Sequence, residues 1–93
     1  GYDQSPTDLA VRELEAFLNE HPGSDLAAEA SSRLKELKER RAQHEYEVGR
    51  FYEQREHPAS ALTYYQAIVS QFAQTSWAPK AAERIHVLQA GAR

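Results

Sequence analysis

Residues 9–37, LAVRELEAFLNEHPGSDLAAEASSRLKEL, correspond to residues 60–88, SALTYYQAIVSQFAQTSWAPKAAERIHVL, at an offset of 51 residues. Six positions are identical, namely Ala10 and Ala61, Ala16 and Ala67, Ala27 and Ala78, Ala30 and Ala81, Arg33 and Arg84, and Leu37 and Leu88. Apolar positions are also copied, since Phe17 matches Ile68 and Leu34 matches Ile85. A duplicated unit of helix, turn and helix is typical of stacked-repeat proteins, which usually bind other proteins.

Proline, glycine and hydroxyl residues mark the ends of the helices. Ser5 followed by Pro6 predicts a helix start, because serine caps unpaired N–H groups and proline lacks the N–H that a first helical residue leaves free. The segment His21-Pro22-Gly23-Ser24 ends that helix. His57-Pro58 repeats the start for a third helix, and residues 73–76 form the turn before a last helix.

Between these hairpins lies one long segment without a helix breaker. Residues 25–56 contain no proline and a single glycine, Gly49, while their apolar residues keep helical spacing. We therefore expect one long helix here, and a break near Arg41 is the alternative. At 1.5 Å per residue the helix would measure about 48 Å, so we expect its middle, residues 35–45, to be exposed to solvent.

Composition favours a protein partner over nucleic acid or membrane. Eleven Lys and Arg against fourteen Asp and Glu give a net charge of −3, with both signs interspersed. No stretch has the roughly 18 apolar residues that a membrane span needs. The chain has no cysteine, which excludes disulfides and thiolate metal ligands. It also has no methionine and starts Gly1-Tyr2, so we expect a C-terminal fragment of a longer protein whose targeting signal would lie upstream.

Part of the chain keeps the spacing of the tetratricopeptide (TPR) repeat. Val48-Gly49-x2-Tyr52 is followed by Ala61-x3-Tyr65, with Gly49 and Ala61 where two helices would approach closely. Glu45 stands where the pattern has tryptophan. We predict an all-α, TPR-like, right-handed stack of helical hairpins, with about four helices and the long central one over about residues 25–56. Residues 1–93 would form a single domain, with residues 1–4 and 90–93 frayed.

The irregular array is similar to the C-terminal half of the BamD (YfiO or ComL) lipoproteins. The resemblance rests on residues 13–18 leading to His21-Pro22-Gly23-Ser24, on Leu34-x2-Leu37-x2-Arg40-Arg41-Ala42-x-His44-Glu45, on Val48-Gly49-Arg50-Phe51-Tyr52, and on Ala61-Leu62 through Ala78-Pro79. It covers nearly the whole chain. The segment from His44 to Tyr52 is its most specific part.

The resemblance implies a scaffold in the assembly of outer-membrane β-barrel proteins. The full-length protein would sit at the periplasmic face of the bacterial outer membrane, anchored by a lipid on an upstream cysteine that this chain lacks, and this fragment would be soluble. Its partners would be the POTRA domains of the β-barrel insertase and the other lipoproteins of that complex. The alternative is an independent TPR adaptor, or a helical repeat that self-associates through its last helix.

Five residues of the long helix are candidates for protein binding. If Gly49 is the eighth position of a TPR, the residues that face the concave groove are Gln43, Tyr46, Arg50, Glu53 and Gln54. Exposed tyrosine beside arginine is typical of interface anchors. The alternative, about equally favoured, is that Tyr46 packs on the neighbouring helix and Arg50 is a solvated charge. We also expect Trp77 to pack between repeats and Tyr64 to face outward.

The sequence offers no support for an enzyme. Its four histidines are scattered, His44-Glu45 has no second histidine four residues on, and no nucleophile or phosphate-binding motif is present. We therefore predict no catalytic residues, no cofactor and no metal site.

Overall fold

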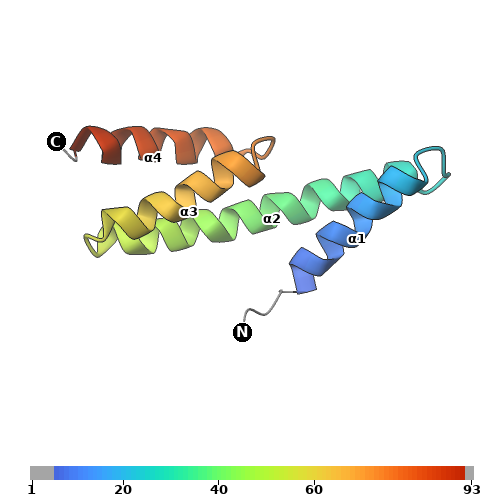
Figure 1. Ribbon diagram of the computed structural model, residues 1–93, viewed down its shortest axis with the longest axis horizontal. Coiled ribbons are helices and arrows are strands. Elements are labelled where there is room, and N and C mark those ends of the chain that lie inside the picture. Colours follow the sequence, from blue (N-terminus) through green and yellow to red (C-terminus); the bar gives the residue numbers. More distant parts are fainter. Residues whose placement is uncertain (1–5, 92–93) are drawn as a thin grey trace. The chain divides into compact units, whose positions relative to one another are not determined.

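Four α-helices make up the part of the chain that the computed structural model describes, residues 6–91 (Figure 1). They are α1 (Pro6–Glu20), α2 (Ala27–Gln54), α3 (Pro58–Gln71) and α4 (Trp77–Gly91), and no strand occurs within those residues. The expected all-α, TPR-like fold is confirmed. The predicted cap Ser5 and the ends 1–4 and 92–93 lie outside the described residues, while residues 90 and 91 belong to α4.

The long helix is continuous. α2 runs without interruption through Arg41, so the alternative with two helices is wrong, and its ends lie two residues inside the expected 25–56. The chain divides into two compact units with the boundary between Lys38 and Glu39, so α2 contributes to both. That residues 1–93 form a single domain stays a prediction.

The turn between α1 and α2 and the turn between α3 and α4 have the same backbone hydrogen bonds, at the same offset of 51 residues that the sequence shows. In each turn one N–H closes the preceding helix, a second spans the turn, and a third opens the next helix. The equivalent bonds are His21 to Phe17 (2.8 Å) and Phe72 to Ile68 (2.8 Å), Ser24 to His21 (3.1 Å) and Thr75 to Phe72 (3.0 Å), and Ala27 to Ser24 (3.0 Å) and Ala78 to Thr75 (3.3 Å). The duplication is therefore a duplication of backbone conformation.

The first unit consists of α1 and the beginning of α2. Leu37 and Ala30 of α2 are buried, whereas α1 has no buried residue. The apolar stripe predicted on α1 is present but only half-buried, for example at Leu14 and Phe17. An ion pair of 3.0 Å joins Lys38 of α2 to Glu15 of α1.

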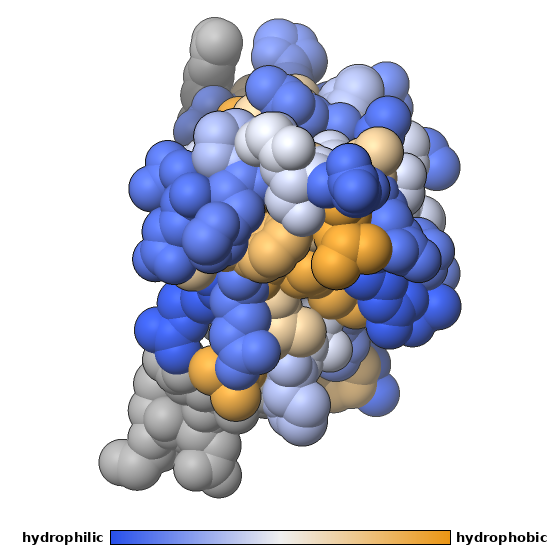
Figure 2. Space-filling model, turned by 90° about the vertical axis from the view of Figure 1, so that its right-hand side faces the viewer, coloured by the Kyte–Doolittle hydropathy of each residue, from blue (hydrophilic) through white to orange (hydrophobic). Residues whose placement is uncertain are grey.

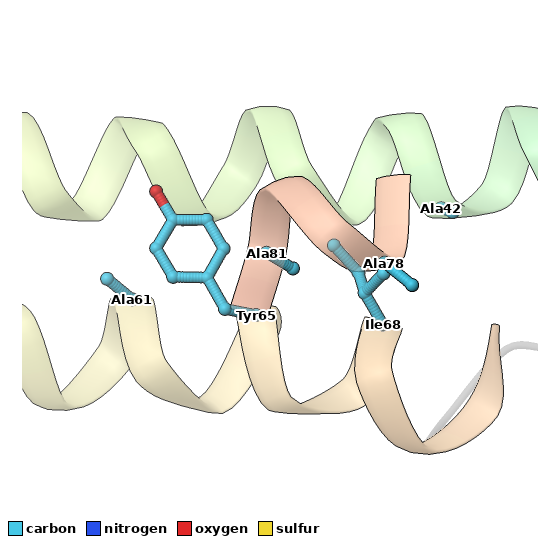
Figure 3. Close-up of a cluster of buried hydrophobic side chains, with 6 residues drawn as sticks. All are labelled: Ala42, Ala61, Tyr65, Ile68, Ala78 and Ala81. Atoms are coloured by element: carbon cyan, nitrogen blue, oxygen red, sulfur yellow. The ribbon is translucent and has the colours of Figure 1, made fainter. Parts of the chain in front are cut away.

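The second unit contains the main core, built from the second part of α2 with α3 and α4 (Figure 3). Its buried members are mostly small: Ala42, Ala61, Tyr65, Ile68, Ala78 and Ala81. Alanines let the helix backbones approach, and the ring of Tyr65 extends from α3 toward α2 in Figure 3. The ring passes Gly49, where a Cβ atom would lie 2.5 Å from Cε1 of Tyr65. Gly49 and Ala61 thus have the roles that the TPR spacing predicts.

The middle of α2 is less exposed than the sequence suggests. Leu37, Ala42 and Glu45 are buried, so the expectation that residues 35–45 lie in solvent is wrong for this stripe. The physical reason is that packing within each unit covers these side chains, Leu37 in the first unit and Ala42 and Glu45 in the second. Glu45, at the position of the TPR tryptophan, is 8% exposed and forms an ion pair of 3.0 Å with Arg41.

The end of α2 and the start of α4 are closed by specific hydrogen bonds. At the end of α2, the N–H of His57 donates to the carbonyl of Tyr52 (3.0 Å) and that of Glu56 to Glu53 (3.1 Å), which is a Schellman motif. Glu56 occupies its left-handed position, with φ of 61°. At the start of α4, the N–H and hydroxyl of Ser76 donate to Oε1 (2.5 Å) and Oε2 (2.7 Å) of Glu39 in α2.

Candidate protein-binding face of the long helix

The five residues predicted to bind a protein all lie in the part of α2 that belongs to the second unit, but they have different surroundings. Gln43 and Gln54 are exposed, and Gln43 donates a hydrogen bond of 3.2 Å to Glu47 on the same helix. Tyr46, Arg50 and Glu53 are half-buried. The face therefore combines two exposed amides with three side chains that take part in packing.

Tyr46 packs within the aromatic part of the core. Its ring centroid lies 5.5 Å from that of Tyr65 and 5.2 Å from that of Trp77. Tyr46 therefore packs as the alternative predicts. Trp77 also packs as expected, and Nζ of Lys80 lies 4.3 Å from the centroid of the Trp77 ring. Leu26, the equivalent of Trp77 in the first copy, is exposed instead. Tyr46 is thus a structural residue with part of its surface in solvent.

Glu53 is the centre of a polar network between three helices. It accepts a hydrogen bond of 2.7 Å from the hydroxyl of Tyr65 on α3 and one of 3.1 Å from Nε of Arg84 on α4. Nη2 of Arg84 donates to its second oxygen. The guanidinium of Arg84 holds the pKa of Glu53 below its ordinary value, and burial opposes this shift. The same hydrogen bond with Glu53 raises the pKa of Arg84.

The hydroxyl of Tyr65 holds its proton more tightly than a tyrosine in water does. Burial raises the pKa of its hydroxyl, and the hydrogen bond to Glu53 raises it further. A neutral tyrosine donates its proton to the charged Glu53, so both groups are satisfied in the interior. The network fixes α2, α3 and α4 at one point.

Arg50 has no such partner. Its Nε atom is buried and finds no hydrogen-bond acceptor among residues 6–91. Its charge lowers the pKa of both Glu53 and Tyr65. Arg50 as a whole is half-buried.

Sequence reasoning missed several residues beside these five. Phe51 is 46% exposed, and the guanidinium of Arg55 lies 3.8 Å above its ring. Tyr64, expected to face outward, stacks on Tyr52 with ring centroids 5.7 Å apart. Phe51 and Tyr52 were visible as an aromatic pair in the most specific segment, but helical spacing alone did not show that one is exposed and the other is covered.

Arg84 was also missed, although it is one of the six identical repeat positions. Its equivalent Arg33 forms an ion pair of 2.9 Å with Glu36 on an exposed surface. Arg84 instead pairs with Glu53 in a half-buried place. Sequence identity between the copies did not reveal that only one of these arginines is part of an interior network.

Several large apolar side chains are exposed on the surface. The large exposed ones are Leu9, Leu26, Phe51, Val69 and Val87. On the face shown in Figure 2, apolar surface is bordered by hydrophilic side chains. Within residues 6–91, no group of three or more His, Asp or Glu is arranged to hold a metal ion. None of the helices found in that range is both long and apolar enough to cross a membrane.

Comparison with protein families places most of the chain in a known family. The model of the family YfiO, described as outer membrane lipoprotein, matches residues 2–90. This match includes α1, α2, α3, all of α4 but its last residue, and all five candidate residues. Comparison with curated proteins finds no match.

Proposed function

Because the chain belongs to the YfiO family of outer membrane lipoproteins, we propose that it is a non-enzymatic scaffold of the complex that assembles β-barrel proteins in the outer membrane. The observation that carries this proposal is the family match over residues 2–90, together with a fold whose polar residues join helices. The partners would be the POTRA domains of the barrel-shaped insertase and other lipoproteins of the same complex.

We propose the exposed side of the second part of α2 as the docking surface. Gln43 and Gln54 mark its two ends, and Arg50 and Tyr46 lie between them with part of their surface in solvent. Phe51 under Arg55 extends it toward the turn after α2. Half-buried tyrosine and arginine, held by packing, lose little conformational entropy on binding, which is the property of interface anchors.

Binding of the purified chain to a POTRA-domain protein, measured by isothermal titration calorimetry, tests the proposal. Gln43→Trp and Gln54→Trp add bulk at exposed positions, so they should weaken binding about tenfold or more if the surface is buried in the complex. Gln66→Trp on α3, also exposed, is the matched control and should bind like the wild type. Tyr46→Ala would remove a core ring, so it requires a check of folding by circular dichroism.

Two results would contradict this assignment. Wild-type binding by both tryptophan variants would exclude this side of α2, and a chain that binds no POTRA domain would exclude that partner.

We propose that the full-length protein acts at the periplasmic face of the outer membrane, held by a lipid on a cysteine upstream of these residues. The description of the family as outer membrane lipoprotein supports this. Labelling of the full-length protein with a radioactive fatty acid, followed by separation of inner and outer membranes, tests it. Label that is absent, or present in the inner membrane alone, would contradict it.

Self-association through α4 is the second candidate function. Val87 on this helix is 45% exposed, while Ile85 and Leu88 pack against the core. Ile85→Asp would therefore unfold the chain, whereas Val87→Asp tests only the outer surface. In sedimentation experiments a dimer that Val87→Asp abolishes and Gln89→Asp preserves would support self-association, and a monomeric wild type would exclude it.

A further inference from the structure

Phe51 and Arg55 form an exposed pair where α2 ends. The guanidinium carbon of Arg55, the first residue after α2, lies 3.8 Å from the centroid of the Phe51 ring. Both residues are exposed, and Phe51 is so to 46%. A guanidinium over an aromatic ring is held by attraction to the face of the ring, and this contact uses none of its N–H donors. These donors therefore remain available to a partner.

The ring beside Arg55 is braced by its neighbours. Phe51 meets Tyr52 edge-on, with ring centroids 5.3 Å apart and an interplanar angle of 88°. Tyr52 is half-buried, and it stacks on Tyr64 of α3. It also lies 6.4 Å from the ring of His57, in the turn between α2 and α3. Because Phe51 rests on a ring that is itself packed, it loses little side-chain entropy when a partner covers it.

Arg55 has no acid within reach along the helix, unlike two other arginines of α2. Those two form ion pairs with an acid three or four positions further on, namely Arg33 with Glu36 (2.9 Å) and Arg41 with Glu45 (3.0 Å). The residues three and four positions before Arg55 are aromatic, and the helix ends at Gln54. No ion pair joins Arg55 to a carboxylate in the part of the chain that the structure describes.

The charges around the pair favour a single carboxylate over an extended anionic surface. Glu47, four positions before Phe51 on the same helix, and Glu56, directly after Arg55, are both exposed. These acids would repel a membrane of anionic lipids or a nucleic acid, and the net charge of −3 acts in the same direction. One carboxylate, in contrast, matches the one charge of Arg55.

We propose that Arg55 and Phe51 together bind a polypeptide segment in which an Asp or Glu stands beside an apolar residue. The carboxylate pairs with the guanidinium of Arg55, and the apolar side chain covers the ring of Phe51. This inference rests on the proposed scaffold function, because it names the groups presented by the partner that docks on α2. Arginine suits this role, since its fork takes a carboxylate in bidentate fashion and the ring already orders its long side chain.

A small probe with the same two groups tests the site without the assigned partner. The probe is the blocked peptide acetyl-Glu-Phe-amide, its uncharged control is acetyl-Gln-Phe-amide, and inorganic phosphate is a third arm. In a ¹H–¹⁵N NMR spectrum we expect the glutamate peptide to move the Nε–Hε signal of Arg55 in a saturable way and the glutamine peptide to leave it in place. Arg40, an exposed arginine of the same helix, should respond less. Arg55→Gln assigns the signal.

A second measurement uses the POTRA-domain protein and isothermal titration calorimetry. Arg55→Gln should weaken binding about tenfold, because a charge-assisted hydrogen-bonded pair is lost. Arg40→Gln removes the same charge at another exposed position of α2, so it is the matched control and should bind like the wild type. Circular dichroism shows that each variant is folded.

A double-mutant cycle tests whether the two residues act as one site. Phe51→Leu keeps an apolar side chain but removes the ring face that holds the guanidinium. Arg55→Gln should therefore weaken POTRA binding less in the Phe51→Leu background than in the wild type. Fully additive effects would show that Arg55 and Phe51 do not share a ligand.

The outcomes separate this inference from the proposed function. If the POTRA domain binds wild type and Arg55→Gln equally and no peptide moves the Arg55 signal, the inference is wrong while the scaffold stands. A stronger response to phosphate than to the glutamate peptide, or binding to phosphatidylglycerol vesicles that Arg55→Gln abolishes, also overturns it. If the glutamate peptide moves Arg55 selectively but no POTRA domain binds, the site stands and the assigned partner is wrong.

Discussion

At the scale of single residues, the packing of the second unit depends on a glycine as much as on large side chains. Gly49 has no side chain, and the ring of Tyr65 fills the space beside it. That ring is fully buried, and its hydroxyl donates to Glu53, so it cannot move aside without breaking the polar network. The close approach of α2 and α3 and the network of Glu53 are therefore one arrangement.

Gly49→Ala should destabilise the protein although alanine is the better helix former. The added methyl group would lie 2.5 Å from a ring carbon of Tyr65. Overpacking costs about 1–3 kcal/mol, while replacing glycine in a helix gains about 1 kcal/mol, so we expect a net loss of about 1 kcal/mol in urea unfolding. Gly91→Ala, where nothing lies within 4 Å of the new atom, is the control. Equal stability of both variants and the wild type would show that the helices separate easily.

Glu53 should make stability depend on pH in a defined direction. Its pKa in the folded chain lies below 4.5, so the unfolded chain binds the proton more readily. The stability it contributes is fully present above the unfolded pKa and is lost as the pH falls through the folded one. Urea unfolding from neutral pH to about pH 3 should show the wild type and Glu53→Gln converging below about pH 4.5. A constant difference over this range would mean that Glu53 gains nothing from its charge.

At the scale of elements, helices and turns follow local rules, and the two turns repeat the same hydrogen bonds. Other hydrogen bonds are specific to one helix end. α2 ends in a Schellman motif, and Ser76, just before α4, donates to Glu39 of α2. A carboxylate at a helix N-terminus also interacts favourably with the helix dipole. Glu39 thus ties the start of α4 to the middle of α2.

The Schellman motif contains a residue with a strained backbone conformation, and a glycine there would remove the strain. Glu56 has a φ of 61°, a conformation that costs a residue with a side chain about 1–2 kcal/mol and glycine almost nothing. Glu56→Gly should therefore raise the free energy of unfolding by about 0.5–1 kcal/mol after the greater chain entropy of glycine is counted. Thermal and urea unfolding would measure this, with Glu56→Ala as the control that keeps the strain. A destabilised Glu56→Gly variant would contradict the left-handed turn.

At the scale of the whole molecule, burial is uneven between the two units. The second unit has a core of six buried residues, whereas α1 in the first unit has none. Yet α2 runs through both units as one helix. Local stability follows the number of buried apolar contacts, so the chain should open in parts.

Amide hydrogen exchange should detect this difference. We expect the amides of α1 to exchange faster than those of α3, which has Ala61, Tyr65 and Ile68 buried, and those of α2 to become better protected after Lys38. Ile68→Ala, which removes part of the main core, should speed exchange in α3 and α4 most. Uniform protection over all four helices would show that both units open together.

The sequence by itself determined the features of the fold that depend on residues close together in the chain. Pro6, Pro58 and the turn segments set the helix boundaries to within about two residues, the offset of 51 announced two equivalent turns, and the segment around Gly49 indicated the family. These features are local because proline, glycine and helical periodicity act within a few residues of the chain.

Only the tertiary structure decided the roles of the side chains on α2. Spacing placed Tyr46, Arg50 and Glu53 on one side of a helix, but which residues of α3 and α4 face that side depends on helix packing. Glu53 pairs with Arg84, 31 positions along the chain, while Nε of Arg50 has no acceptor among the described residues. Such pairings are set by distance in space, because burial and electrostatic attraction act between atoms in contact regardless of their separation in sequence.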